Sequence, residues 1–312
     1  MPPLEPQVYA CVGLRQGMSS EAVRFAATLR TKEAPRRVLS DADAVDVLRT
    51  LSEGNAKNAI EYSQWIERVA EAVDATVGNR RREAVTKIGH ARLLAVAIEL
   101  RGFPKTKRQE LLDKWERLTF RIFGMFSKDA RTKVGDYVRL AWRVIAENLK
   151  SEEVTTALHE LGEGYDIDDA IKELSDTDCY DRWQEELRYF FYRYEEHLAA
   201  ESGQKFSNEQ WERIWEASAS TSIEHICPQS KGSLKPSRNR IFVHRLGNLV
   251  LLKPGLNSKL SDNNPADKAD AYQKTGLLIA QEVAAKAKRW DRDAVEQREK
   301  RLLEWARKTW GD

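Results

Sequence analysis

The sequence lacks the apolar run of about 18 residues that a membrane-spanning helix would need. Residues 1–6, MPPLEP, contain no basic region followed by an apolar stretch, so a secretory signal peptide is not expected. Cysteine is scarce, and Cys11, Cys179 and Cys227 lie far apart without forming a CxxC pair. This spacing argues against a structural zinc site and fits a reducing compartment, so we expect a cytoplasmic protein.

The sequence also lacks a large excess of either charge. It holds 51 Lys and Arg against 49 Asp and Glu, a net charge of +2, so bulk charge does not predict a nucleic-acid partner. One segment differs, because residues 225–261 contain no Asp or Glu. A purely positive segment in a nearly neutral chain is a candidate surface for phosphate contacts, although it could also be an ordinary solvated loop. The basic residues of this segment are Lys231, Lys235, Arg238, Arg240, Arg245, Lys253 and Lys259.

Most of the chain has the pattern of consecutive helices. With 41% apolar and 32% charged residues in 312, the composition is typical of a globular protein with room for two domains. Ser40 should cap a helix that has Asp41 and Asp43 in its first turn and that ends at Gly54. The apolar spacing predicts further helices over 56–77, 83–101, 105–127, 130–149, 152–162 and 180–200.

The pattern changes after residue 205. Residues 203–207 should form a linker, and Ser207 could cap a short helix. Residues 221–227 and 241–252 are rich in Ile, Val, Thr and Leu, which predicts two strands joined by a polar loop over 229–239. Helices should follow over 266–273, 277–289 and 291–309. We therefore predict a mainly α protein, with a large helical domain over 1–205 and a small ββα module with a helical tail over 206–312.

Polar side chains suited to hydrolysis of a phosphodiester gather in the predicted hairpin. Glu224 and His225 are adjacent in the first strand, Asn248 lies in the second, and Asn257 begins the following turn. An imidazole can take a proton from water near neutral pH. One divalent cation held by one or two protein oxygens can stabilise the charge on the phosphate and on the leaving oxygen. Adjacent strand residues point to opposite faces, so the two can serve one centre only where the strand ends, as Pro228 would force.

Three sequence blocks carry a specific resemblance. They are Glu-His-Ile-x-Pro-Gln-Ser from Glu224, His-Arg-Leu-Gly-Asn-Leu-x-Leu-Leu from His244, and Leu-Asn-Ser-Lys from Leu256. Together they resemble an HNH, or His-Me finger, nuclease, and most of all the C-terminal HNH domain of the GmrSD family of modification-dependent restriction endonucleases. The close similarity covers about forty residues, in which Glu and Asn stand where HNH proteins more often have Asp and His.

The resemblance implies a role for each matching residue. His225 would be the general base and Asn248 would orient its imidazole, whereas Glu224 and Asn257 would bind one Mg²⁺ or Mn²⁺ ion. Lys259 and Arg245 would contact phosphate, while the other basic residues named above, together with His244, are candidate contacts to DNA. Alternatives remain for several of them: His244 could pack instead, Asn248 could form a turn, and Asn257 could cap the next helix.

The resemblance predicts a metal-dependent DNA endonuclease that nicks one strand per site, in a restriction or anti-phage defence system. A double-strand break would need two chains or two events, which leaves a dimer open. The family usually carries an N-terminal domain with an Asp-Gly-Gln-Gln-Arg motif for nucleotide-linked sensing of modified DNA, and this chain lacks that motif. We therefore expect a sensor domain or subunit elsewhere, with this chain a separate nuclease subunit or the C-terminal part of a longer protein. The alternatives are an inactive HNH-like module that binds DNA or a partner, and a helical interaction protein.

Overall fold

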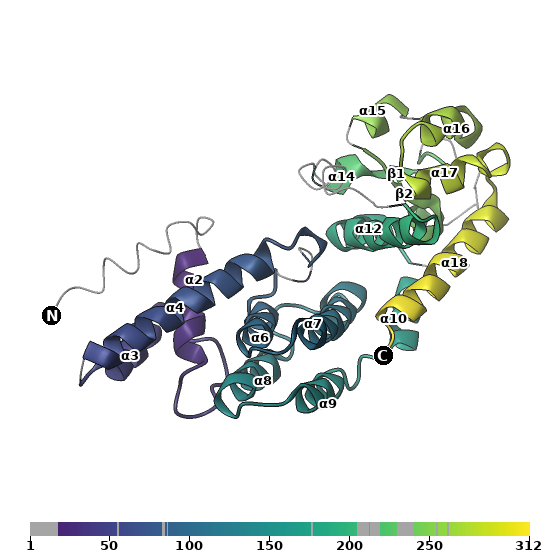
Figure 1. The fold of residues 1–312 in the computed structure, drawn as a ribbon. Coiled ribbons are helices and arrows are strands. Elements are labelled where there is room, and N and C mark those ends of the chain that lie inside the picture. Colours follow the sequence, from purple (N-terminus) through teal and green to yellow (C-terminus); the bar gives the residue numbers. More distant parts are fainter. Residues whose placement is uncertain are drawn as a thin grey trace. The chain divides into compact units, whose positions relative to one another are not determined.

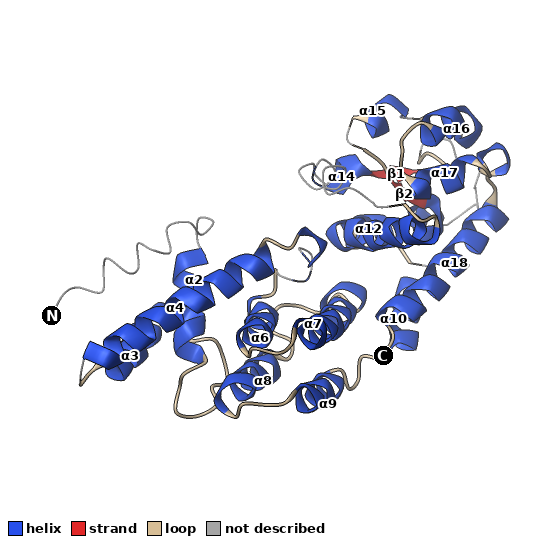
Figure 2. Cartoon of the chain, viewed as in Figure 1, coloured by secondary structure: helices blue, strands red, loops and turns tan. Residues whose placement is uncertain are grey.

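A computed structural model describes residues 18–312 except 55, 83, 84, 86, 176, 205–211, 213–218, 230–239, 254 and 261. Over these residues the protein is mainly helical, with one two-stranded sheet (Figures 1 and 2). No helix in this part of the chain is long and apolar enough to cross a membrane. The prediction of a mainly α protein is confirmed.

The chain forms two compact units. Unit 1 holds Met1–Phe123, Lys128–Gly164 and Asp312, and unit 2 holds Gly124–Ser127 and Tyr165–Gly311. The sequence places the domain boundary at 205/206 instead. The helix before that point, α12 (Gln184–Glu201), falls in unit 2 because it packs on strand β2 (Leu249–Leu251) and helix α17 (Leu278–Ala284). Residues 205–211 lie outside the described part, and the boundary at 205/206 stays a prediction.

Unit 1 is built around a helix that is apolar on nearly all sides. This helix, α6, buries eight of its twelve residues and packs against α4, α7 and α8, so its sequence fits a central position. Indole groups tie neighbouring helices to the core: Trp65 donates to the carbonyl of Ala26 at 3.0 Å, and Trp115 donates to that of Ala91 at 2.9 Å. The helices of unit 1 are α2 (Met18–Thr28), α3 (Asp41–Ser52), α4 (Ala56–Val77), α6 (Gly89–Leu100), α7 (Lys105–Thr119), α8 (Val134–Ala146) and α9 (Ser151–Leu161), with a short 3₁₀ helix η2 (Arg80–Arg82).

Local sequence signals predict several of these helices correctly. Ser40 caps α3 by accepting a hydrogen bond from the amide of Asp43 at 3.2 Å, as predicted. Helix α4 has the predicted bounds. The helix predicted over 105–127 ends at Thr119 and continues into unit 2 as a π-helical turn, η3 (Phe120–Met125). That over 83–101 begins only at Gly89.

Unit 2 surrounds the small sheet with helices. Strands β1 (Ile223–His225) and β2 are antiparallel, with Glu224 opposite Val250 and His225 opposite Leu249. Phe190, Phe191 and Trp305 help to form the aromatic core between α12 and the last helix. The remaining elements of unit 2 are α10 (Ile167–Leu174), α11 (Cys179–Arg182), α14 (Ala219–Ser222), η4 (Arg240–His244), η5 (Leu246–Asn248), α15 (Leu256–Leu260), α16 (Pro265–Gln273), η6 (Ala287–Arg289) and α18 (Arg292–Trp310).

The second predicted strand, 241–252, is a strand only at Leu249–Leu251. The preceding residues form η4 and η5 because they are bound by α18 instead of by a partner strand. Arg298 donates to the carbonyls of Leu246, Gly247 and Leu249 at 3.4, 3.0 and 2.7 Å. A side chain at Gly247 would put its Cβ 2.1 Å from the carbonyl oxygen of Val295, so only glycine allows this close approach.

Candidate nuclease site

Three predicted site residues line one pocket of about 380 Å³ in unit 2. Glu224 and His225 reach it from β1, where the strand ends, and Asn257 reaches it from α15. Asp262, two residues after the end of α15, adds a carboxylate that the sequence analysis did not single out. The full lining is Tyr180, Ile223, Glu224, His225, Pro228, Gln229, Asn257 and Asp262.

Glu224 is held by a buried lysine that local sequence gave no reason to select. Nζ of Lys268, on α16, contacts Oε1 of Glu224 and donates to the carbonyl of His225 at 2.9 Å. The lysine side chain is fully buried, and the glutamate side chain is 5% exposed. Tyr272, one turn further along α16, donates to the same Oε1 at 3.5 Å. Burial raises the pKa of the Glu224 carboxyl, and the ammonium of Lys268 opposes that shift.

Both ring nitrogens of His225 have partners. Nε2 lies 3.1 Å from Nδ1 of His244, and Nδ1 lies 3.3 Å from the side-chain nitrogen of Gln229. The Tyr180 ring covers the pair, with its centroid 4.3 Å from that of His225 and stacked 5.6 Å from that of His244. Burial lowers the pKa of His225 to about 3, and the neighbouring His244 and Lys268 act in the same direction. The imidazole is therefore neutral near pH 7, as a general base must be.

Asn248 does not orient the imidazole as predicted. It is fully buried, and its carboxamide bonds to the backbone: Oδ1 accepts from the amide of Cys227 at 2.9 Å, and Nδ2 donates to the carbonyls of Cys227 and Val243 at 3.0 and 2.8 Å. The indole of Trp290 also donates to Oδ1, at 3.1 Å. Asn248 thus fixes the chain that follows His225, whereas His244 and Gln229 contact the ring itself.

Asn257 is oriented by the first strand, because its Nδ2 donates to the carbonyl of Ile223 at 2.9 Å. This bond uses the nitrogen of the carboxamide, so the oxygen is the atom suited to a cation. Glu224, Asn257 and Asp262 together offer oxygen ligands, the type that Mg²⁺ and Mn²⁺ prefer. The donor set therefore fits the metal that the sequence predicts.

The predicted DNA contacts divide into three groups. Lys259 is exposed on α15 beside Asn257, and Lys253 is half-buried. Arg245 is only 8% exposed and pairs with Glu299, with Nε 3.1 Å from Oε2, so little of its side chain is open to a phosphate in this structure. Lys231, Lys235 and Arg238, and the side chain of Arg240, lie outside the described residues.

His244 also belongs to a second group of ligand-type atoms. One atom each from Asp178, Asp181 and His244 lie within 4.8 Å of one another, so these residues could also hold a metal ion. No sequence pattern connects this group, because Asp178 and Asp181 are distant in sequence from the HNH-like blocks. Asp178 also caps α11, accepting from the amide of Asp181 at 2.9 Å.

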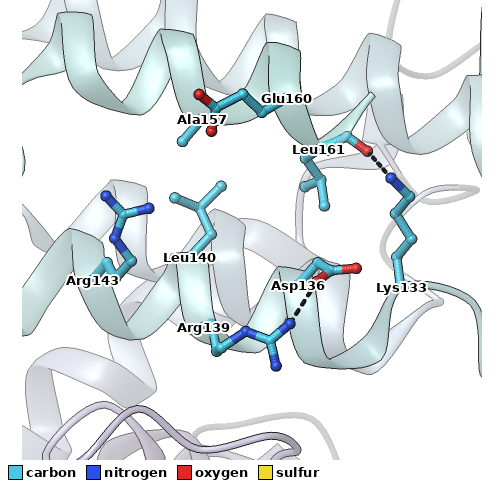
Figure 3. A pocket seen from close by; sticks show the side chains of 8 residues that line it. All are labelled: Lys133, Asp136, Arg139, Leu140, Arg143, Ala157, Glu160 and Leu161. Atoms are coloured by element: carbon cyan, nitrogen blue, oxygen red, sulfur yellow. Dashed lines mark hydrogen bonds and ion pairs between the residues drawn. The ribbon is translucent and has the colours of Figure 1, made fainter. Parts of the chain in front are cut away.

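Unit 1 has a pocket of about 350 Å³ between α8 and α9, and Figure 3 shows its lining. Its charged groups pair locally: Arg139 bonds Asp136 at 2.6 Å, and Lys133 donates to the carbonyl of Leu161 at 2.8 Å. Its eight lining residues include no histidine or cysteine. A histidine lines the unit 2 pocket that holds Glu224 and Asn257, whereas none lines this one.

Residues 165–305 match the family model described as GmrSD restriction endonucleases, C-terminal domain. The matched segment lies within the main segment of unit 2, Tyr165–Gly311. No curated protein matches the chain. The match confirms the resemblance: residues 165–305 are similar to the C-terminal domain of GmrSD restriction endonucleases, and this similarity suggests a nuclease domain of the restriction-endonuclease type.

Proposed function

We propose that the protein is a metal-dependent HNH endonuclease that nicks DNA within a modification-dependent restriction or anti-phage defence system. The observation that carries this proposal is that Asn257, from the third sequence block, meets Glu224 and His225, from the first block, in one pocket. The GmrSD family match supports DNA as the substrate. The exposed Lys259 beside Asn257 supports a path for the phosphate backbone.

The proposed reaction is hydrolysis of one phosphodiester bond. A water molecule loses a proton to His225 as its oxygen bonds to phosphorus, and the bond from phosphorus to the 3′ oxygen breaks. Because its pKa is low, the imidazole of His225 is unprotonated near pH 7 and can receive that proton. Glu224 and Asn257 would hold the cation, with Asp262 as a further oxygen ligand, and Lys268 would keep the Glu224 carboxylate in place. When bound, a divalent cation supplies stabilisation of the charge on the phosphate and on the leaving oxygen.

Plasmid nicking tests the proposal. Supercoiled plasmid, prepared with and without modified bases, is incubated with the protein and Mg²⁺ or Mn²⁺. We expect open-circular product that EDTA prevents, and a loss of at least a hundredfold in rate for His225→Ala. The matched control is His159→Ala, which removes an exposed histidine of unit 1 and should leave the rate unchanged.

Equal nicking by the His225→Ala variant would overturn the proposed mechanism. Salt-sensitive DNA binding without product, on both kinds of plasmid and with both metals, would instead support the inactive DNA-binding alternative.

A further inference from the structure

The contacts of His225 determine which of its ring nitrogens carries the proton. The side-chain nitrogen of Gln229 can only donate a hydrogen bond, so Nδ1 of His225, 3.3 Å away, must accept it. A neutral imidazole has one proton, which therefore lies on Nε2. Nε2–H then donates to Nδ1 of His244 at 3.1 Å. This chain of contacts leaves the lone pair of His225 on Nδ1, on the side of Gln229, which lines the pocket.

We propose that His244 is a positioning residue that holds His225 in the tautomer with its basic lone pair on Nδ1. This inference rests on the proposed nuclease function, and it gives His244 the role that the sequence analysis assigned to Asn248. During hydrolysis, the water proton would pass to Nδ1 of His225, and His244 would stabilise the resulting imidazolium through the bond to Nε2–H. Gln229 would give way to the attacking water, because both compete for the same lone pair.

The surroundings of His244 suit an acceptor of this kind. Its ring stacks on Tyr180 at an interplanar angle of 22°, which fixes its orientation and limits access of water to the pair. A carboxylate oxygen from each of Asp178 and Asp181 lies within 4.8 Å of a ring nitrogen of His244. A carboxylate beside an imidazole helps to fix the orientation of the ring, as carboxylate partners of catalytic and metal-bound histidines do.

Two substitutions of His244 separate this role from simple packing. In Asn, the side-chain oxygen takes nearly the position of Nδ1 in His, so His244→Asn keeps an acceptor for Nε2–H. Leu fills similar space without any acceptor, so His244→Leu removes the bond. We expect the single-turnover rate of nicking to fall ten- to a hundredfold in His244→Leu and to stay within about threefold of wild type in His244→Asn. The concentration of DNA that gives half-maximal rate should change less than twofold in both.

A second measurement needs neither DNA nor metal. The ¹⁵N shifts of the histidine rings, with His225 identified by comparison with His225→Ala, report which nitrogen carries the proton. We expect the proton on Nε2 in the wild type and in His244→Asn, and a mixture of tautomers in His244→Leu. If wild-type protein fails to nick DNA but shows this pattern, the proposed function fails while the assigned tautomer stands.

Three results would overturn the inference. They are a proton on Nδ1 of His225 in the wild type, a His244→Leu variant that is folded by circular dichroism and nicks at the wild-type rate, and an equal loss of rate in His244→Asn and His244→Leu. If His244→Leu does not fold, the tautomer of His225 in the wild type and the nicking rate of His244→Asn decide whether the inference holds.

Discussion

The pockets of the two units hold their charges in opposite ways. In unit 1, the pair Arg139–Asp136 lines the pocket with side chains that are 44% and 51% exposed. In unit 2, Glu224 lines the pocket and pairs with Lys268, and the two side chains are 5% and 0% exposed. Exposed pairs contribute little to stability, whereas buried charges are costly to desolvate and need a partner. Unit 2 therefore keeps a buried ion pair, despite its cost in desolvation, at the position where the proposed chemistry requires a fixed carboxylate.

The largest effect should come from breaking the buried pair. Lys268→Met keeps a side chain of similar length but leaves Glu224 without its cation, so we expect a loss of about 3–5 kcal/mol in unit 2. Hydrogen exchange of the amides in Ile223–Ile226 measures the opening free energy of this hairpin without a signal from unit 1.

The matched control in unit 1 is Arg139→Ala, for which about 0.5 kcal/mol or less is expected. The double variant Glu224→Gln/Lys268→Met should recover part of the loss, since it no longer buries an unpaired charge. Similar losses for Lys268→Met and Arg139→Ala would contradict the comparison.

A second, smaller effect tests the close contact between η5 and α18. Gly247→Ala would place Cβ 2.1 Å from the carbonyl oxygen of Val295, so the segment that carries Asn248 must shift. We expect a loss of about 1–3 kcal/mol from this overpacking, again measured by hydrogen exchange of β1.

Gly102, in unit 1, provides the control for a glycine without a close neighbour. Its φ of +76° strains an alanine, but nothing lies within 4 Å of the added Cβ. Gly102→Ala should therefore cost about 1 kcal/mol from backbone strain alone. A Gly247→Ala variant as stable as wild type would mean that α18 does not fix this segment.

The smallest effect concerns a buried histidine outside the proposed site. Burial lowers the pKa of His90 in unit 1, while its bond to the carbonyl of Thr132 opposes the shift. Because the folded state resists protonation, the unfolded state binds more protons below pH 6.5, and the stability of unit 1 should fall as the pH decreases. Above pH 6.5 this contribution is constant. At pH 5.5 the unfolded imidazole is protonated about ten times more often than it is neutral. The resulting loss in the free energy of unfolding should be at most about 1.4 kcal/mol.

Urea unfolding at pH 7.5 and pH 5.5 measures this dependence, with His90→Gln as the reference that lacks the titrating group. The variant should lose less stability than the wild type between the two values. An identical pH dependence in both proteins would assign the effect to other residues.

Sequence reasoning succeeded where local rules decide the structure. The bounds of α4 and the Ser40 cap of α3 depend on residues only a few positions apart. The strand predicted over 241–252 was mostly wrong because Arg298 and Gly247 act across about fifty residues, and no local pattern contains that contact. The abundance of Ile, Val, Leu and Phe predicted a strand, and tertiary contacts imposed 3₁₀ turns instead.

The same distinction applies to the candidate site. Glu224, His225 and Asn257 could be selected because they stand in recognisable blocks. Gln229 stood in the first block but was passed over, whereas Asp262, Lys268 and Tyr180 had no signal beyond ordinary composition. Arg245 was predicted to contact phosphate from its charge and its place in the second block, and only the fold reveals Glu299 as its partner.

The side chain of Asn248 forms hydrogen bonds with both the amide and the carbonyl of Cys227. Cys227 lies two residues after His225, and its reduced thiol is fully buried. A thiol-specific reagent can reach this sulfur only when the hairpin releases it. The rate of alkylation of Cys227 therefore measures how often the segment that follows His225 opens. Burial raises the pKa of the other buried thiol, Cys179, to about 12, so little of it is the reactive thiolate. Alkylation of Cys179 should therefore be slow and should add little to the measured signal.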